Sequence, residues 1–204
     1  MPVIETLPLG DYQTNCYLLR QEASSRCVLI DPGYEPSFLL SRLEEEGLTL
    51  DAILLTHGHF DHVGGVRDLA AETDCRVYIH PDDLSMPPRL TAGPIYYTDT
   101  YGEGDTVTEA GLSFRVLHTP GHTPGSVCLR LGNDLFCGDT LFAGSCGRTD
   151  LPGGNTGAMR ASLKRLAAIP ENLDLHPGHG PGSTLEAEKK YNPYFGYGLN
   201  AANR

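Results

Sequence analysis

Metal-binding side chains stand in the turns after several predicted strands, and this arrangement restricts the fold more than any other feature of the sequence. The short apolar run at residues 51–56 (DAILLT) is typical of a buried strand, and the crowded stretch HGHFDH follows it directly. Other candidates stand in Gly- or Pro-rich turns after later strand-like runs. The candidate ligands are His57, His59, Asp61, His62, His122, Asp139 and His179. Because loops at strand ends can bring distant ligands together on a rigid scaffold, we expect a sheet-based fold with one site at its edge.

Two halves of similar make-up indicate the fold class. In the first half, three strand-like runs within residues 1–30 precede a predicted helix at 36–47, a strand at 51–56, a helix at 63–73 and a strand at 76–80. The second half predicts strands at 112–118, 126–132, 134–142 and 173–180, with an amphipathic helix at 158–169. Two sheets with helices on their outer faces account for this order, so we predict an α/β fold.

The composition excludes several classes of protein. The chain of 204 residues has the length of one well-buried domain, and we expect residues 1–204 to form a single domain. Its formal net charge of -11 leaves no basic surface for a nucleic-acid backbone. The N-terminus does not resemble a signal peptide, and no apolar stretch approaches the ~20 residues of a membrane span, so we predict a cytoplasmic protein. Six cysteines without a CxxC pair predict reduced core thiols.

Residues 81–104 are rich in Pro, Gly and Tyr and show no clear periodicity. We interpret them as a long surface excursion, in which Tyr96 and Tyr97 are available to line a substrate entrance.

The spacing of the ligands indicates two metal positions. In an extended segment, side chains two residues apart point the same way, so His57 and His59 can bind one metal together. Asp61 and His62 follow where the chain turns into the next helix and can face a second metal. Five imidazoles and two carboxylates suit zinc, with iron or manganese as alternatives. A structural zinc site would use the same residue types.

Four other metal-capable residues are not expected to be ligands. His80, His118 and His176 precede turns without ligand-like spacing, and turn chemistry alone explains Asp31 in residues 31–33 (DPG).

Together, the motifs resemble the metallo-β-lactamase superfamily, whose fold is a four-layer αβ/βα sandwich with a metal site at one edge of the two sheets. The resemblance extends from DPG through THGHFDH, PGHTPGS and GDTLF to PGHG at residues 177–180. It implies His57, His59 and His122 on one metal, with Asp61, His62 and His179 on the other. Asp139 would bridge the two.

Within the superfamily, the chain resembles glyoxalase II, a thioesterase that cleaves hydroxyacyl-glutathione thioesters such as S-lactoylglutathione. The resemblance implies a metal-bridging hydroxide as nucleophile, a catalytic role for Asp61 and a substrate contact for Arg148, which stands where glyoxalase II has a lysine. Two divalent ions, two aspartates and one hydroxide leave a charge of about +1, which favours an anionic thioester. The chain departs from glyoxalase II at Gly180 and Pro181, and the helical C-terminal domain of the full-length enzymes is not expected here.

Two alternatives remain open. Persulfide dioxygenases share the fold and the CGRTD stretch at residues 146–150, and hold a single iron with the equivalents of His57, His122 and Asp139. A non-catalytic module that only holds metal would need a site without an open coordination position. The sequence does not indicate the oligomeric state.

Overall fold

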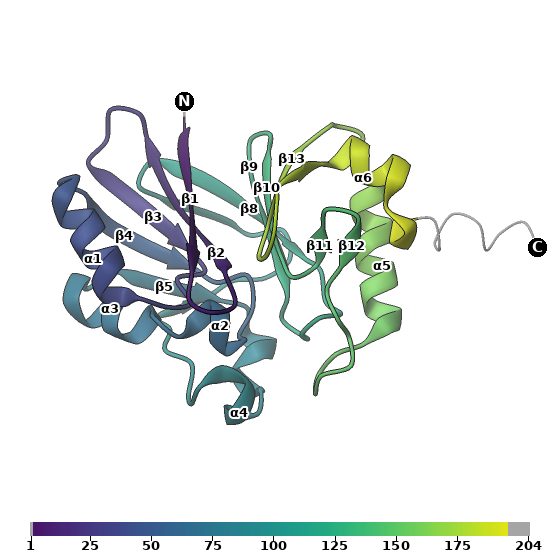
Figure 1. The fold of residues 1–204 in the computed structure, drawn as a ribbon, viewed down its shortest axis with the longest axis horizontal. Coiled ribbons are helices and arrows are strands. Elements are labelled where there is room, and N and C mark those ends of the chain that lie inside the picture. The colour runs from purple at the N-terminus through teal and green to yellow at the C-terminus, as the bar shows by residue number, and fades with distance from the viewer. Residues whose placement is uncertain (1, 196–204) are drawn as a thin grey trace, which may run out of the picture.

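Two six-stranded sheets pack face to face, and helices cover the outer face of each (Figure 1). The computed structural model describes residues 2–195. The first sheet has the strand order β1 (Pro2–Leu9), β2 (Thr14–Gln21), β3 (Arg26–Ile30), β4 (Thr49–Leu54), β5 (Arg76–Ile79), β6 (Asp99–Thr100). The second has the order β14 (Ser183–Thr184), β13 (Asp174–Pro177), β10 (Asp134–Gly138), β9 (Val127–Leu131), β8 (Leu112–His118), β7 (Thr106–Glu109). A separate hairpin joins β11 (Leu141–Phe142) to β12 (Ser145–Cys146).

The first sheet changes from antiparallel to parallel pairing at β3. β1, β2 and β3 form an antiparallel meander, as the sequence predicts, and β3, β4, β5 and β6 pair in parallel. Parallel neighbours need a crossover between them. The first two crossovers contain α1 (Pro36–Glu45), α2 (Phe60–Val63) and α3 (Val66–Thr73), and the third, between β5 and β6, contains only short helices. The carboxyl ends of β3, β4 and β5 therefore lie side by side at one edge of the sheet.

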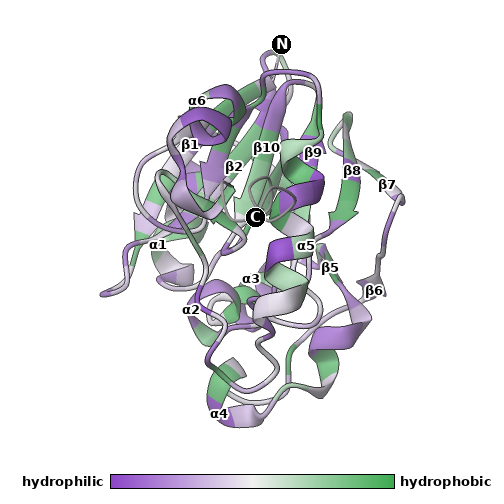
Figure 2. Cartoon of the chain, turned by 90° about the vertical axis from the view of Figure 1, so that its right-hand side faces the viewer, coloured by the Kyte–Doolittle hydropathy of each residue, from purple (hydrophilic) through white to green (hydrophobic). Residues whose placement is uncertain are grey.

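In the second sheet, all pairs are antiparallel except β10 with β13. The crossover between these two strands contains α5 (Thr156–Ala167), and α6 (Leu185–Tyr191) follows β14. The Asn155 side chain accepts a hydrogen bond from the backbone N–H of Ala158 and so caps the first turn of α5. Hydrophobic and hydrophilic residues alternate along α5 (Figure 2), and Met159, Leu163 and Leu166 on this helix pack in the core with residues of the second sheet.

Three layers of buried apolar side chains separate these elements. One lies between the first sheet and helices α1 and α3, one between the two sheets, and one between the second sheet and helices α5 and α6. Strand β8 shows the period of two that sheet packing requires: Leu112, Phe114 and Val116 are buried, whereas Ser113 and Arg115 are exposed. The α/β class and the four-layer αβ/βα order predicted from the sequence are both confirmed.

Residues 81–104 lie largely at the surface, as the sequence analysis predicts, but they contain regular elements that it does not predict. They contain η1 (Pro81–Ser85), α4 (Pro88–Thr91) and β6, and Asp83, Met86 and Thr91 are buried. Helices of four or five residues are too short to show periodicity, and their prolines stand at helix starts, where proline is favoured. Tyr96 and Tyr97 are partly exposed. Tyr96 lines a small cavity beside α3. The role of these two tyrosines at a substrate entrance stays a prediction.

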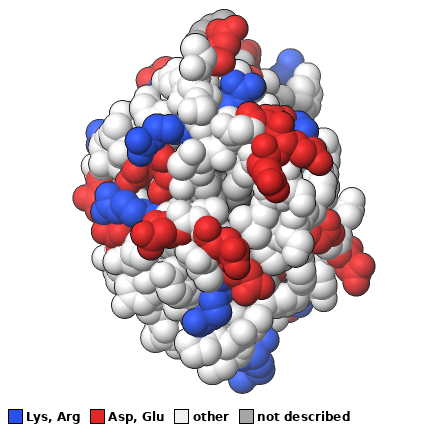
Figure 3. Space-filling model, turned by 90° about the vertical axis from the view of Figure 1, so that its left-hand side faces the viewer, with Lys and Arg blue, Asp and Glu red and all other residues white. Residues whose placement is uncertain are grey.

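All six cysteines are unpaired thiols, and all but Cys146 are buried, as predicted. Within residues 2–195, none of the helices is long and apolar enough to cross a membrane. On the face that carries α1 and α3, acidic and basic side chains are interspersed (Figure 3).

We predict that Phe114→Ala destabilises the protein by about 3–5 kcal/mol, because its ring is fully buried between the sheets and its removal leaves a cavity. Phe38→Ala is the matched control, since the Phe38 side chain on α1 is 47% exposed, and it should cost about 0.5 kcal/mol or less. Urea unfolding followed by circular dichroism measures both. Equal losses would contradict the assignment of Phe114 to the central core.

Candidate metal centre

The structure brings together all seven side chains that the sequence predicts as ligands. His57 and His59 follow β4, and Asp61 and His62 lie in α2 at the same edge of the first sheet. The other three follow strands of the second sheet: His122 in the loop between β8 and β9, Asp139 after β10, His179 after β13. The site therefore lies where the edges of the two sheets meet.

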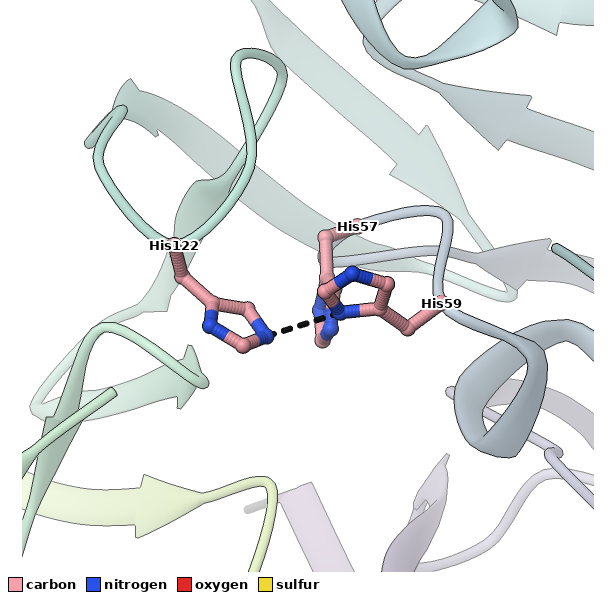
Figure 4. Close-up of side chains that lie close together, drawn as sticks. All are labelled: His57, His59 and His122. Atoms are coloured by element: carbon pink, nitrogen blue, oxygen red, sulfur yellow. Dashed lines mark hydrogen bonds between the residues drawn. The ribbon is translucent and has the colours of Figure 1, made fainter. Parts of the chain in front are cut away.

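His57, His59 and His122 form the first group, named here the three-histidine group (Figure 4). All three side chains are buried. The centroids of their rings lie 4.5–4.9 Å apart, and Nδ1 of His59 is 2.8 Å from Nε2 of His122. One potential ligand atom from each residue lies within 4.8 Å of those of the other two, so a single cation can contact all three.

Asp61, His62 and His179 form the second group, and their potential ligand atoms also lie within 4.8 Å of one another. Oδ2 of Asp61 lies 3.6 Å from Nε2 of His62 and 3.2 Å from Nε2 of His179. The hydroxyl of Thr14 donates a long hydrogen bond of 3.4 Å to the same oxygen. Asp61 and His62 in the crowded stretch thus face a different set of partners from His57 and His59.

Asp139 lies between the two groups. Its carboxylate oxygens are 3.4 Å from Nε2 of His122 in the three-histidine group, and 3.5 Å and 3.7 Å from Nε2 of His62 and His179 in the second group. Asp139 thus contacts imidazoles of both groups, and it does so through both of its carboxylate oxygens. This position fits a ligand shared by two cations.

Several buried atoms at the site lack hydrogen-bond partners within the described part of the chain. They are Nε2 of His57, Nε2 of His59, Nε2 of His62 and Oδ1 of Asp139. An unpaired buried polar atom is costly, and clusters of them in a native fold call for a missing partner. Imidazole nitrogen and carboxylate oxygen are the donors that zinc, iron and manganese accept. The residues present therefore fit divalent cations.

The protonation of the histidines agrees with this fit. Burial and the neighbouring imidazoles lower the pKa of His57, and lower that of His59 to about 4, so both present a neutral ring with a free electron pair. Burial also opposes the charge of His62, but Asp139 and Asp31 raise its pKa to about 9. A cation at His62 would take the place of that proton.

Asp31 belongs to the site, and our expectation that turn chemistry alone explains it is wrong. Its carboxylate is buried, lies 2.9 Å from Nδ1 of His62, and accepts hydrogen bonds from the backbone N–H and the hydroxyl of Thr56. Thr56 in turn lies 3.1 Å from Nδ1 of His57. A carboxylate on the outer nitrogen of a histidine fixes the tautomer that leaves the other nitrogen free for metal. The sequence carries one signal for a role of Asp31 at the site: this residue directly follows β3, the neighbour of β4.

The loop that carries His179 is held by the first sheet. Asn15 and Tyr17 on β2 both donate side-chain hydrogen bonds to the carbonyl oxygen of Pro177, at 3.0 Å and 2.6 Å. Gly178 approaches the site so closely that a Cβ atom there would lie 2.3 Å from Oδ1 of Asp139. Glycine in the PGHG stretch is thus required by this contact, and the loop position depends on contacts between the sheets.

The three histidines left out of the predicted ligand set lie outside the two groups. His176 is 2.8 Å from Asp134 and stacks on Phe136. His80 and His118 stack on each other with centroids 4.1 Å apart. With Asp82 they form a further cluster of potential ligand atoms, but the electron pairs of nearly parallel rings lie in separate, nearly parallel planes and do not converge well on one point.

Arg148, the predicted substrate contact, does not point to a metal group. Its backbone carbonyl lies 2.8 Å from Nδ1 of His122, so its segment adjoins the three-histidine group. Its exposed guanidinium makes a bidentate ion pair with Asp150 and lines a cavity of about 580 Å³.

Comparison with known proteins identifies the family. The sequence profile of the Metallo-beta-lactamase superfamily matches residues 9–179, which is most of the chain. The chain belongs to this superfamily, and it is a hydrolase-like enzyme of that family with clusters of metal-binding residues.

Two curated relatives carry a specific activity in their names. The chain is 42% identical to the hydroxyacylglutathione hydrolase of Aeromonas hydrophila, over 87% of this chain and 65% of that enzyme. It is 32% identical to the hydroxyacylglutathione hydrolase GloC of Haemophilus influenzae, over 94% of this chain and 97% of that protein.

Solved structures show the same fold in proteins with different descriptions. The B3 metallo-β-lactamase BLEG-1 is 37% identical and superposes with a TM-score of 0.86, over 95% of this chain and 99% of that one. TTHA1623 in a di-iron-bound form is 43% identical, with a TM-score of 0.82 over 93% and 99%. ETHE1 from Myxococcus xanthus is 30% identical, with a TM-score of 0.82 over 99% and 92%.

We predict that Asp31→Asn weakens binding of a divalent cation by about 10- to 100-fold, because an amide presents one acceptor oxygen where the three donors around Asp31 need a carboxylate. Competition with a chromophoric chelator measures the affinity. Asp68→Asn, at an exposed carboxylate on α3, serves as the control and should bind like the wild type. Unchanged affinity in Asp31→Asn would show that this carboxylate does not orient His62.

Proposed function

We propose that this chain, as a member of the metallo-β-lactamase superfamily, is a metal-dependent thioester hydrolase that acts on hydroxyacyl-glutathione thioesters of the S-lactoylglutathione type. The observation that carries the proposal is the pair of ligand groups joined by Asp139, with unpartnered nitrogen atoms in both groups. Support comes from two relatives named hydroxyacylglutathione hydrolases, one of which matches over nearly its whole length.

In this proposal, the three-histidine group holds one cation, the second group holds the other, and Asp139 contacts both. Two bound divalent cations supply the chemistry, since they make water acidic enough to act as a nucleophile near neutral pH and polarise the carbonyl that is attacked. We propose zinc, while iron and manganese suit the same donors, and a similar structure has been solved in a di-iron-bound form. Asp61 has the proposed catalytic role, since its carboxylate lies against His179 and within 3.4 Å of the Thr14 hydroxyl.

Arg148 is the proposed contact to the substrate. The cavity that it lines also has Arg160 at its edge and an apolar wall formed by Met159 and Leu163. The carboxylate of Asp150 binds the Arg148 guanidinium through two hydrogen bonds, and a glutathione carboxylate would bind it in the same bidentate manner. The cavity adjoins the metal centre through the backbone of Arg148, which contacts His122. An anionic thioester can therefore place its glutathione part there and its carbonyl at the cations.

The alternative function is that of a mono-iron persulfide dioxygenase acting on glutathione persulfide. It is favoured by the CGRTD stretch and by the proximity of His57, His122 and Asp139, which would hold the iron. The second group, Asp61, His62 and His179, would have no cation in this case, although it is as compact as the first.

The deciding experiment measures metal identity and stoichiometry in protein purified without added metal, and assays the same sample with three substrates. These are S-lactoylglutathione, glutathione persulfide with oxygen uptake, and a β-lactam, which the similarity to BLEG-1 makes necessary. We expect about two cations per chain and thiol release from S-lactoylglutathione. The variant His57→Ala should lose turnover and bind less metal, whereas His176→Gln, outside both groups, should bind as the wild type does. One iron per chain with oxygen uptake would establish the dioxygenase instead.

We predict that Arg148→Ala raises KM for S-lactoylglutathione about three- to tenfold with little change in kcat, because a partly exposed guanidinium contributes one net hydrogen-bond interaction to ground-state binding. Steady-state kinetics measure both constants. Arg115→Ala, at an exposed arginine on β8, is the matched control and should leave KM unchanged. A fall in kcat at constant KM would assign Arg148 to the chemical step instead.

A further inference from the structure

One fully buried carboxylate outside both ligand groups contacts the metal centre. Asp83, in η1, has no solvent exposure and accepts three hydrogen bonds from the chain. Its Oδ2 accepts from the backbone N–H of Gly58 and from the hydroxyl of Thr123, both at 2.8 Å. Its Oδ1 accepts from the backbone N–H of Gly125 at 2.6 Å. Both oxygens of the Asp83 carboxylate therefore accept hydrogen bonds from the chain around them.

The partners of Asp83 belong to the two segments that carry the three-histidine group. Gly58 stands between His57 and His59, and Thr123 directly follows His122. The carboxylate thus ties the segment after β4, in the first sheet, to the loop between β8 and β9, in the second. These two segments have to keep a fixed separation if all three imidazoles are to reach one cation.

Two glycines make this approach of Asp83 possible. A Cβ atom on Gly125 would lie 2.8 Å from Cγ of Asp83, and one on Gly58 would lie 3.3 Å from its Cβ. Neither glycine has a positive φ angle, so backbone conformation does not explain them. Close packing of Asp83 explains Gly125, and Asp83 together with Ile95 and Met86 explains Gly58.

The second group has a different support. Asp31 lies against His62, and the loop that carries His179 is held by β2. Among the hydrogen bonds of residues 2–195, those of Asp83 reach none of Asp61, His62 and His179. Asp83 therefore supports the three-histidine group alone, whereas Asp31 contacts His62 and also reaches His57 through Thr56.

We propose that Asp83 is a positioning residue that keeps the three-histidine group in its cation-binding arrangement, so that its loss weakens the cation at this group and spares the cation at the second. The inference rests on the proposed function, since it requires two cation positions. Its physical basis is that ligands bind tightly when surrounding hydrogen bonds fix them beforehand. Without the carboxylate, the buried N–H groups of Gly58 and Gly125 have no acceptor and the two segments can move apart.

The test uses four variants of the full chain. Asp83→Asn keeps the shape and leaves one acceptor oxygen for donors on both sides. Thr123→Val removes one donor to Asp83, and Thr123→Ser retains the hydroxyl as the conservative replacement. Asp82→Asn changes the adjacent, largely exposed carboxylate and is the matched control. Circular dichroism of each metal-free variant establishes that it is folded, and Thr123→Val decides the question if Asp83→Asn does not fold.

The readout is binding of Zn²⁺ at each group, followed by the ¹⁵N chemical shifts of the individual histidine rings during titration. In the wild type and in Asp82→Asn, we expect the rings of both groups to respond with the same affinities in the two proteins. In Asp83→Asn, we expect His57, His59 and His122 to respond at about 10- to 100-fold higher Zn²⁺ concentration, with His62 and His179 unchanged. Thr123→Val should show a smaller shift of the same kind, and Thr123→Ser should restore wild-type binding.

Two results would overturn the inference: equal weakening at both groups in the folded variants, or wild-type affinity at the three-histidine group in Asp83→Asn. The wild type separates this inference from the proposed function. If the wild type binds two Zn²⁺ ions and Asp83→Asn binds both equally well, only the role of Asp83 fails. If the wild-type rings do not respond to Zn²⁺ at all, the proposed function fails and takes the inference with it.

Discussion

Hydrogen bonds that buried carboxylates accept from the segments carrying the ligands hold the metal centre in place. β3, β4 and β5 run in parallel, so the residues after them meet at one edge of the sheet. Asp31 follows β3, His57 and His59 follow β4, and Asp83 is in the segment after β5. The middle strand thus presents ligands, and the strands on either side present the carboxylates that orient them.

The centre also requires both sheets. The first sheet supplies four of the seven candidate ligands, and the second supplies His122, Asp139 and His179. Contacts between the sheets set the distance between these two sets. They include the bonds from Asn15 and Tyr17 to Pro177 and the burial of Phe114 and its neighbours in the central core. The contacts that stabilise the packing of the two sheets therefore also set the spacing of the ligands.

Most of the fold could be predicted because its signals are local. Period-two burial in β8 and the Pro and Gly positions around α1 are properties of a few adjacent residues. Each candidate ligand stands either in a turn after a strand or, for Asp61 and His62, in the short helix that follows such a turn. Asp31 and Asp83 could not be assigned in this way. Their partners lie 25 to 42 residues away in sequence, and an aspartate in a turn already has a local explanation. The helices in residues 81–104 could not be predicted for a different reason, since they are too short to show a periodic pattern of apolar residues.

Main chain rather than side chain forms much of the wall around the ligands. At Gly58, Gly125 and Gly178, an added Cβ atom would lie within 3.3 Å of an aspartate that binds or supports the site. A side chain at Gly125 or Gly178 would collide with these aspartates, and one at Gly58 would also meet the side chains of Ile95 and Met86, so any replacement here has to displace packed groups. Substitutions at exposed positions such as Arg148 leave these contacts unchanged and can alter the preference for a substrate. The same catalytic interior can then persist through divergence in specificity.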